Sequence, residues 1–162
     1  MQIDNCYEKV KINCLKFIKS QETRTNKFKN KNKMLKSYLI PLCFWINKKV
    51  KKKSSLIIGL AGGQGTGKTT ITTIISIILK KYFKLNVFKI SIDDFYKTRK
   101  DRKKLSKSKH NLLMTRGVPG THDYKLINYF FRKVKIKNSN LLVCQNLINL
   151  LMIDAKETNG IK

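Results

Sequence analysis

Residues 62–69 have the types and the spacing of a loop that holds phosphate groups. They read GGQGTGKT and fit the pattern G-x-x-x-x-G-K-[ST]. Glycines let successive backbone N–H groups point inward around a polyphosphate, and a helix that begins there adds the positive end of its dipole. The candidate phosphate-binding residues are Gly62, Gly63, Gln64, Gly65, Thr66, Gly67, Lys68, Thr69 and Thr70.

Two side chains of this loop predict a nucleotide site rather than a simple anion site. Lys68 can reach the β- and γ-phosphates and neutralise transferring charge, and the Thr69 hydroxyl can join the coordination of Mg²⁺. The alternative interpretation is a glycine-rich turn between a strand and a helix that binds nothing.

Two elements must position this loop. The apolar run at 56–61 predicts a buried strand before it, and an amphipathic helix pattern follows it. The apolar face of that helix consists of Ile71, Ile74, Ile75, Ile78, Leu79 and Tyr82. The face turned away consists of Thr72, Thr73, Ser76, Lys80 and Lys81.

A second strand, predicted over 87–92, ends in Asp93 and Asp94. Strand, helix and strand form a βαβ unit, so the two strands should lie parallel with a right-handed crossover. Ligands gather at the carboxyl ends of such strands, and neighbouring strand residues face opposite sides, so one carboxylate is expected to address the site. That carboxylate could hold Mg²⁺ through water or accept the proton of an attacking hydroxyl, and the residues alone leave open whether it is Asp93 or Asp94. The alternative is that the two aspartates cap the following turn.

The chain has 162 residues, a formal net charge of +27 and a pI near 10.2. Such a charge ordinarily indicates a polyanionic partner. Lysine supplies nearly all of it, together with abundant Asn and Ile, which is the bias of an AT-rich coding sequence. No arginine-rich helix, aromatic-interleaved basic stripe or zinc-finger spacing is visible, so no specific nucleic-acid partner is predicted.

Cysteine use and hydropathy predict a soluble, cytoplasmic protein without a membrane partner. Cys6, Cys14, Cys43 and Cys144 form no C-x-x-C pair, which indicates reduced and mostly buried thiols. The N-terminus has no signal-peptide core, and the apolar run at 141–153 is too short and too interrupted to span a bilayer.

The other segments predict supporting structure. Residues 1–33 are interpreted as a basic, weakly structured segment with one weak amphipathic helix. A helix over 34–45 places Leu35, Tyr38, Leu39, Leu42 and Trp45 on one face. Residues 48–53 form a charged connector, and 97–109 a basic helix or loop. Thr121 is the predicted N-cap of a helix with Leu126, Ile127, Phe130, Phe131 and Val134 on one side.

Three stretches together resemble the D-glycerate 3-kinase group of the P-loop kinases, which is related to uridine kinase, phosphoribulokinase and pantothenate kinase. They are 58–69 (IGLAGGQGTGKT), 91–96 (SIDDFY) and 115–123 (TRGVPGTHD), and the similarity extends over about 38–134. The resemblance implies an α/β fold with a P-loop NTPase-type parallel sheet and flanking helices in a domain over 34–137.

The resemblance also implies ATP with Mg²⁺ and transfer of the γ-phosphoryl group to a hydroxyl of a small hydroxy acid, with D-glycerate as the first candidate. By position, Asp93 corresponds to the carboxylate placed against the acceptor hydroxyl, so the resemblance implies Asp93 as the general base or Mg²⁺ partner. The residues that fall where substrate recognition is expected are Asp94, Tyr96, Arg116, His122 and Asp123. An arginine suits a carboxylate substrate because its fork pairs with both oxygens.

The sequence departs from this family after about residue 137. The family continues through a Phe-Asp-Lys-x-x-x-Asp-Arg motif and a strand ending in Glu-Gly-Trp, so the sheet is expected to be incomplete at its C-terminal side. Residues 145–155 can be translated in another frame as KFDKSIDDRC, which predicts an out-of-frame tail over 138–162. The alternative is an ordinary C-terminal helix that uses Leu141, Leu142, Gln145, Leu147, Ile148 and Leu151.

Three functions stay open from the sequence. The first is a glycerate-type kinase, impaired by the loss of its later strands. The second is another P-loop phosphotransferase that acts on a nucleoside, pantothenate or a sugar phosphate. The third is a basic, non-enzymatic protein that binds polyanions through its lysines. The sequence does not determine the oligomeric state.

Overall fold

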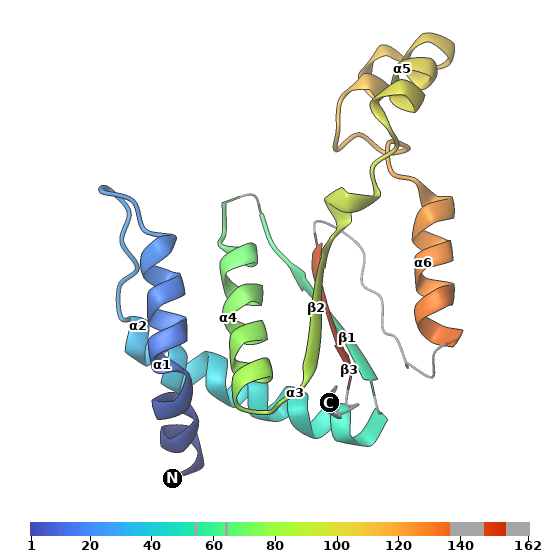
Figure 1. The fold of residues 1–162 in the computed structure, drawn as a ribbon. Coiled ribbons are helices and arrows are strands. Elements are labelled where there is room, and N and C mark those ends of the chain that lie inside the picture. Colours follow the sequence, from blue (N-terminus) through green and yellow to red (C-terminus); the bar gives the residue numbers. More distant parts are fainter. Residues whose placement is uncertain (54, 64, 137–147, 155–162) are drawn as a thin grey trace, which may run out of the picture.

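The structure is a computed structural model that describes residues 1–53, 55–63, 65–136 and 148–154. It combines helices and strands, as expected for an α/β protein (Figure 1). In chain order the elements are α1 (Gln2–Ser20), α2 (Lys31–Met34), the π-helix η1 (Leu35–Leu39), α3 (Ile40–Lys53), β1 (Ser55–Ala61), α4 (Lys68–Lys81), β2 (Asn86–Ser91), the 3₁₀-helix η2 (Ile92–Phe95), α5 (Arg99–Ser108), the 3₁₀-helix η3 (Asn111–Met114), α6 (Tyr124–Ile136) and β3 (Ile148–Asp154).

The described strands form one sheet in the order β1-β3-β2, and both pairings are antiparallel. β1 and β2 therefore run in the same direction, but they do not pair with each other. The two strands thus lie parallel, as predicted, but the described strands do not form the parallel sheet that the resemblance implies, because β3 lies antiparallel between them. Ala61 pairs with Ile148, and Ser91 pairs with Asn149. The carboxyl ends of β1 and β2 thus lie at the same edge of the sheet, one strand apart.

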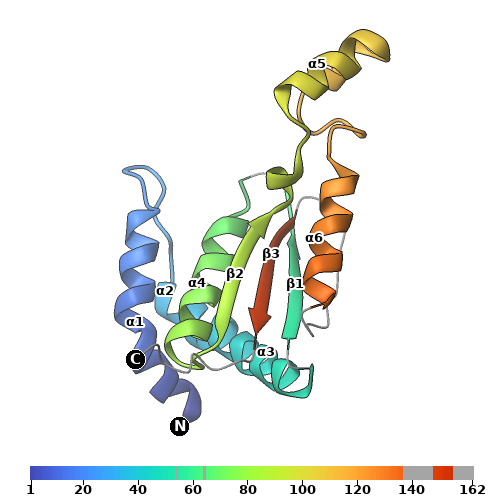
Figure 2. The same cartoon turned by 45° about the vertical axis from the view of Figure 1, so that its right-hand side comes forward.

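Helix α4 lies between the sheet and the N-terminal helices (Figures 1 and 2). The sequence predicts one buried face for it, but Thr72 and Ser76 from the opposite face are also buried. The reason is that α4 packs against β2 on one side and against α1 and α3 on the other. Helix α4, which follows the P-loop, is therefore buried on two sides.

Helix α1 is longer and better packed than the weakly structured segment expected at 1–33. Its side chains Val10, Cys14 and Ile18 are fully buried and belong to the main hydrophobic core together with α3 and α4. The division of the chain into segments at 33 and 137 stays a prediction.

The predicted face of the helix over 34–45 is wrong in part. Tyr38 and Trp45 are 64% and 53% exposed, whereas Ile40 and Cys43 are fully buried. The π-helix η1 explains the difference, because its wider turn advances the buried face by about one residue. The expected connector over 48–53 is also helical, since α3 continues to Lys53.

Two further predictions near the C-terminus need correction. The N-cap of α6 is Asp123 rather than Thr121, because the Asp123 Oδ1 accepts hydrogen bonds from the backbone N–H groups of Lys125 and Leu126 at 3.0 Å each. Residues 148–154 form a strand, so the alternative of a C-terminal helix is wrong there. Residues 138–147 and 155–162 of the tail lie outside the described residues. The frameshift interpretation stays a prediction.

Candidate active site

The loop after β1 adopts backbone conformations that its glycines permit. Gly65 and Gly67 have φ angles of 78° and 79°, in the left-handed region. Gly67 is also the N-cap of α4, so the helix begins directly at Lys68. The N–H groups of the first helical turn and the positive end of the helix dipole therefore lie at the loop, as an anion site requires. Gln64 lies outside the described residues.

The Lys68 side chain folds back over this loop. Its Nζ donates a hydrogen bond to the carbonyl oxygen of Gly62 at 2.8 Å and another to that of Gly63. A Cβ atom at Gly62 would lie 3.0 Å from Thr66 Oγ1 and 3.6 Å from Lys68 Cγ. Glycine at position 62 thus leaves room for the lysine stem and holds the ammonium group at the concave side of the loop.

A cavity of about 230 Å³ lies between the start of α4 and the end of β2. It is lined by Thr69, Thr72, Lys89, Ile90, Ser91 and Asp94. The carboxylate among these lining residues belongs to Asp94 and not to Asp93, the residue that the sequence favours. Thr69 and Asp94 are thus brought to one cavity although they come from different elements.

The two aspartates sit on the 3₁₀-helix η2 rather than on the strand. Asp94 Oδ2 accepts the Ser91 N–H at 2.9 Å, and the Ser91 hydroxyl accepts the Asp93 N–H at 3.2 Å. This reciprocal pair is a capping box. The capping interpretation is therefore confirmed for Asp94, and it fixes the position of the carboxylate that lines the cavity.

The residues expected at the acceptor side form a second cluster around Tyr96. The His122 ring stacks on the Tyr96 ring with centroids 4.1 Å apart, and the Arg116 guanidinium lies 5.6 Å from the centroid of the same ring. A β-bridge joins Tyr96 to His122. Lys97 Nζ donates a hydrogen bond to the His122 carbonyl oxygen, which ties the two segments together again.

His122 sits in an environment that favours its neutral form. Burial lowers the pKa of its imidazole, and the positive charge of Lys97 lowers it further. The negative charge of Asp93 acts in the opposite direction and partly offsets these effects. The His122 Nε2 is buried and has no hydrogen-bond partner among the described residues. Asp93 therefore contributes to the electrostatic environment of His122.

Asp123, the remaining residue of the expected recognition set, has its carboxylate oxygen Oδ1 engaged in capping α6. Its backbone N–H donates to the Phe95 carbonyl oxygen at 2.7 Å. Asp123 thus connects η2 to α6.

Lys89 is a cavity residue that the sequence analysis does not single out. Its Nζ donates a hydrogen bond to Thr73 Oγ1 at 3.0 Å, and its side chain lines the cavity with Thr69 and Asp94. The sequence signal that could have identified it is a lysine two residues after the buried Val87, near the end of the strand that follows the P-loop helix.

The donor set of the cavity fits a magnesium ion that is shared with nucleotide phosphates. Mg²⁺ in proteins is commonly held by one or two carboxylates together with substrate phosphate oxygens. Thr69 supplies a hydroxyl and Asp94 a carboxylate at one cavity beside the P-loop. No group of three metal-ligating His, Cys, Asp or Glu side chains occurs among the described residues, so a metal held by the protein alone is not indicated there.

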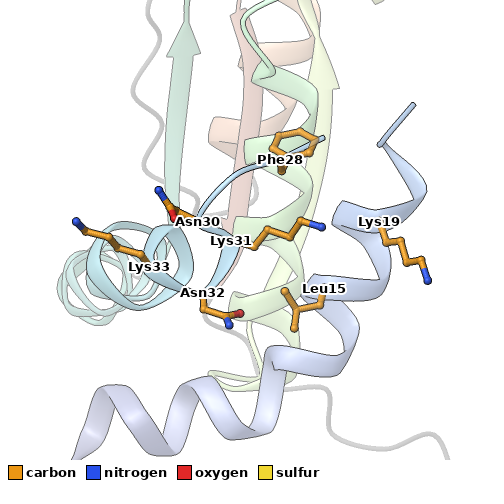
Figure 3. Close-up of a pocket in the computed structure, with 7 residues that line it drawn as sticks. All are labelled: Leu15, Lys19, Phe28, Asn30, Lys31, Asn32 and Lys33. Atoms are coloured by element: carbon orange, nitrogen blue, oxygen red, sulfur yellow. The ribbon is translucent and has the colours of Figure 1, made fainter. Parts of the chain in front are cut away.

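A larger cavity of about 690 Å³ lies far from the P-loop, between α1 and the segment that follows it (Figure 3). The ammonium groups of Lys19, Lys31 and Lys33 point in different directions around it. Lys31 is moreover paired with Glu22 at 2.7 Å. The cavity therefore lacks a convergent set of charged groups.

Within the described part of the chain, no helix combines the length and the apolar character that crossing a bilayer requires.

Three curated proteins with kinase names are similar to this chain. A probable ATP-dependent kinase, TDA10 of Saccharomyces cerevisiae, is 37% identical over 112 residues, which cover 67% of this chain and 38% of that protein. The uncharacterized kinase mug58 of Schizosaccharomyces pombe is 38% identical over 74 residues, covering 44% of this chain and 26% of that protein. The chloroplastic D-glycerate 3-kinase of Arabidopsis thaliana is 34% identical over 101 residues, covering 55% of this chain and 22% of that protein.

The chain thus spans between about a fifth and two fifths of the length of these relatives. No family model matches the chain, and no solved structure matches it. The relatives are named as a probable ATP-dependent kinase, an uncharacterized kinase and a D-glycerate 3-kinase, and they support a P-loop kinase-like assignment for this chain.

Proposed function

We propose that this protein is an ATP-dependent kinase that transfers the γ-phosphoryl group to a hydroxyl of a small hydroxy acid, with D-glycerate as the first candidate. One observation carries the proposal: Thr69, at the start of the P-loop helix, and Asp94, at the end of β2, line the same cavity. The P-loop thus lies beside a hydroxyl and a carboxylate, the kind of oxygen ligands that Mg²⁺ prefers. Phosphoryl transfer with Mg²⁺ needs both a phosphate-binding loop and such ligands.

The residues of the P-loop bind and orient the nucleotide in this proposal. The backbone N–H groups of 62–69 hold the phosphates, and Thr69 with Asp94 would hold the Mg²⁺ that neutralises their charge. Lys68 exchanges its hydrogen bonds to the carbonyl oxygens of Gly62 and Gly63 for contacts to the β- and γ-phosphates.

Asp93 serves the acceptor hydroxyl. As the new bond forms between the acceptor oxygen and the γ-phosphorus, the bond from that phosphorus to the β,γ-bridging oxygen breaks and ADP leaves. The proton of the acceptor hydroxyl passes to the Asp93 carboxylate. Asp93 suits this role because its charge acts on His122, a residue of the cluster that would bind the acceptor.

The cluster around Tyr96 binds the acceptor acid. Arg116 supplies a planar fork for the carboxylate, and Tyr96 holds that guanidinium near its ring. His122, with its unpartnered Nε2, offers a hydrogen bond to a substrate hydroxyl or carboxylate oxygen. Asp123 positions this loop by capping α6.

The test is ADP formation by the full chain with ATP, Mg²⁺ and a panel of acceptors comprising D-glycerate, uridine, pantothenate and ribulose 5-phosphate. The proposal expects turnover with D-glycerate, loss of turnover in Lys68→Ala, and unchanged turnover in Lys80→Ala, an exposed lysine at the other end of α4. A preference for another acceptor would contradict the hydroxy acid as the substrate but would still support the kinase activity. Failure of a fluorescent ATP analogue to bind the wild-type chain would overturn the nucleotide site itself.

A further inference from the structure

The basic segment 97–109 forms an arm that stands apart from the body of the protein. Helix α5 lies beyond the end of the sheet, connected to the rest by the segments before and after it (Figures 1 and 2). Its packing partner is η3. The proposed kinase chemistry uses no residue of α5.

One face of this arm consists of lysines that form no ion pair with the described residues. Lys100, Lys103, Lys104 and Lys107 follow the spacing i, i+3, i+4 and i+7, so they share one side of the helix. All four side chains are exposed. No described acidic group forms an ion pair with any of them, and Asp101, the acidic residue of this helix, bonds the Thr98 hydroxyl at 2.6 Å.

Several lysines elsewhere in the described chain contact acidic or aromatic side chains, unlike the four lysines of this stripe. Lys11 pairs with Glu8, Lys31 with Glu22 and Lys36 with Asp4. Lys9 and Lys49 lie over the rings of Tyr82 and Trp45. The charges on α5 have no such contacts among the described residues and point into solvent.

The opposite face of α5 is fixed by a buried arginine. Arg102 is 8% exposed, and its guanidinium donates to the carbonyl oxygen of Lys97 at 3.2 Å and to that of Met114 at 2.6 Å. Both carbonyls belong to the base of the arm. The lysine stripe is therefore presented on a defined surface and not on a free coil.

We infer that the stripe Lys100–Lys107 is a docking surface for the sugar-phosphate backbone of a nucleic acid. The four lysines extend over about 10 Å of helix, a length that matches roughly three phosphates of one strand. Lysine ammonium groups are point charges that contact phosphates without reading bases, so the binding is independent of sequence.

A membrane is the less suitable occupant of this surface. Basic helices that lie on bilayers insert an apolar face between the headgroups. On α5 the half-buried Leu105 and the buried Arg102 lie away from the lysine stripe, and the helix packs on η3. No apolar face of this helix is left to insert.

The test compares two variants of the full chain that lose the same charge. In K100Q/K103Q/K104Q/K107Q the stripe is neutralised. In K48Q/K49Q/K51Q/K52Q four exposed lysines of α3 are neutralised instead. Binding of a fluorescent 20-base-pair DNA duplex and of a 20-nucleotide poly(U) RNA is followed by anisotropy at several KCl concentrations. Circular dichroism confirms that both variants fold.

The stripe variant is expected to bind either probe on the order of 100-fold more weakly at low salt, with a salt-dependence slope shallower by roughly 3 to 4. The α3 variant and Lys68→Ala should bind within a few-fold of the wild type. Equal weakening of the two quadruple variants would overturn the inference, because net charge alone would then account for binding. Loss of binding to phosphatidylserine vesicles but not to either nucleic acid would also overturn it and would make the surface a membrane site.

Discussion

The imidazole of His122 stacks on the phenol ring of Tyr96, with centroids 4.1 Å apart and an interplanar angle of 23°. The two residues are separated by the whole α5 arm, so this contact and their β-bridge close the arm at its base. Burial lowers the pKa of the imidazole, so the closed base favours neutral His122.

Lowering the pH should destabilise the contact between Tyr96 and His122 at the foot of the α5 arm. A histidine whose pKa is lower in the folded than in the unfolded state stabilises the fold above the unfolded pKa, about 6.5. That stabilisation is lost as the pH falls through the folded pKa. We therefore expect the free energy of unfolding to decrease between about pH 6.5 and the lower folded pKa of His122. Urea denaturation at a series of pH values measures this decrease.

His122→Gln is the matched variant for this prediction. It should flatten the pH dependence in the same interval, and the NMR titration of the His122 ring in the wild type should show a midpoint below 6.5. A midpoint above 6.5 would show that the Asp93 charge prevails over burial.

Gly67→Ala should be destabilising by about 1–2 kcal/mol, because position 67 has a φ of 79° that an L-residue with a Cβ adopts only under strain. Gly63→Ala is the control. Its added Cβ would meet Thr66 Cγ2 at 3.6 Å, an ordinary contact, and its φ is not in the left-handed region. Urea midpoints of the two variants measure the difference, and similar midpoints would show that the loop readjusts around the methyl group added at position 67.

Thr69→Ala should raise the Mg²⁺ concentration needed for half-maximal turnover by on the order of tenfold, because one oxygen ligand is lost from the proposed site. Lys80→Ala, an exposed position at the other end of α4, removes no residue that lines the cavity. It should leave the Mg²⁺ requirement unchanged. Titration of turnover with MgCl₂ distinguishes the two variants, and equal behaviour would argue against Thr69 as a ligand.

Arg102→Met should loosen the α5 arm without unfolding the body. The change removes both hydrogen bonds to the carbonyls of Lys97 and Met114, which should cost about 1–3 kcal/mol locally. Limited trypsin digestion should then cleave within 97–109 faster than in the wild type. Arg99→Met, at an exposed position of the same helix, should leave the cleavage rate unchanged apart from the lost site.

The buried thiols should report on the docking of α1. Burial raises the pKa of Cys6 to about 11 and that of Cys14 to about 12, and it also raises the pKa of Cys43. The higher pKa of Cys6 lowers the fraction of its thiolate near pH 8 by about 100-fold relative to an exposed cysteine. In a Cys144→Ser background, reaction with a disulfide reagent should therefore be at least that much slower in buffer than in urea. Rapid reaction in buffer would mean that α1 detaches readily from α3 and α4.

The local features of the site could be predicted from the sequence. The loop and the start of α4 follow from glycines and a helix pattern that are contiguous in the chain. The roles of Asp93 and Asp94 were harder to separate, because the prediction used the alternation of a strand. The chain leaves the strand at Ser91 and enters η2, so alternation no longer decides which carboxylate lines the cavity.

Long-range features could not be predicted in this way. The π-helix η1 changes which side chains of the following helix are buried, and neither Tyr38 nor Trp45 carries a local signal of that shift. The antiparallel insertion of β3 depends on pairing with strands more than fifty residues away, which no pattern within 148–154 specifies. The N-cap at Asp123 was missed because Thr121, an equally good capping residue, instead donates its hydroxyl to the Val118 carbonyl oxygen at 2.6 Å.

The strand order has a consequence for assembly. Two neighbouring hydrogen-bonded spacings place the backbones of β1 and β2 roughly 9 to 10 Å apart, and β3 fills that interval. The phosphate loop and the acidic turn can each form from residues that are close in the chain, but the spacing between β1 and β2 is completed only when 148–154 inserts between them. Insertion of β3 between β1 and β2 would then be the step that completes the cavity. It should be slow, because it joins residues that are far apart in the chain.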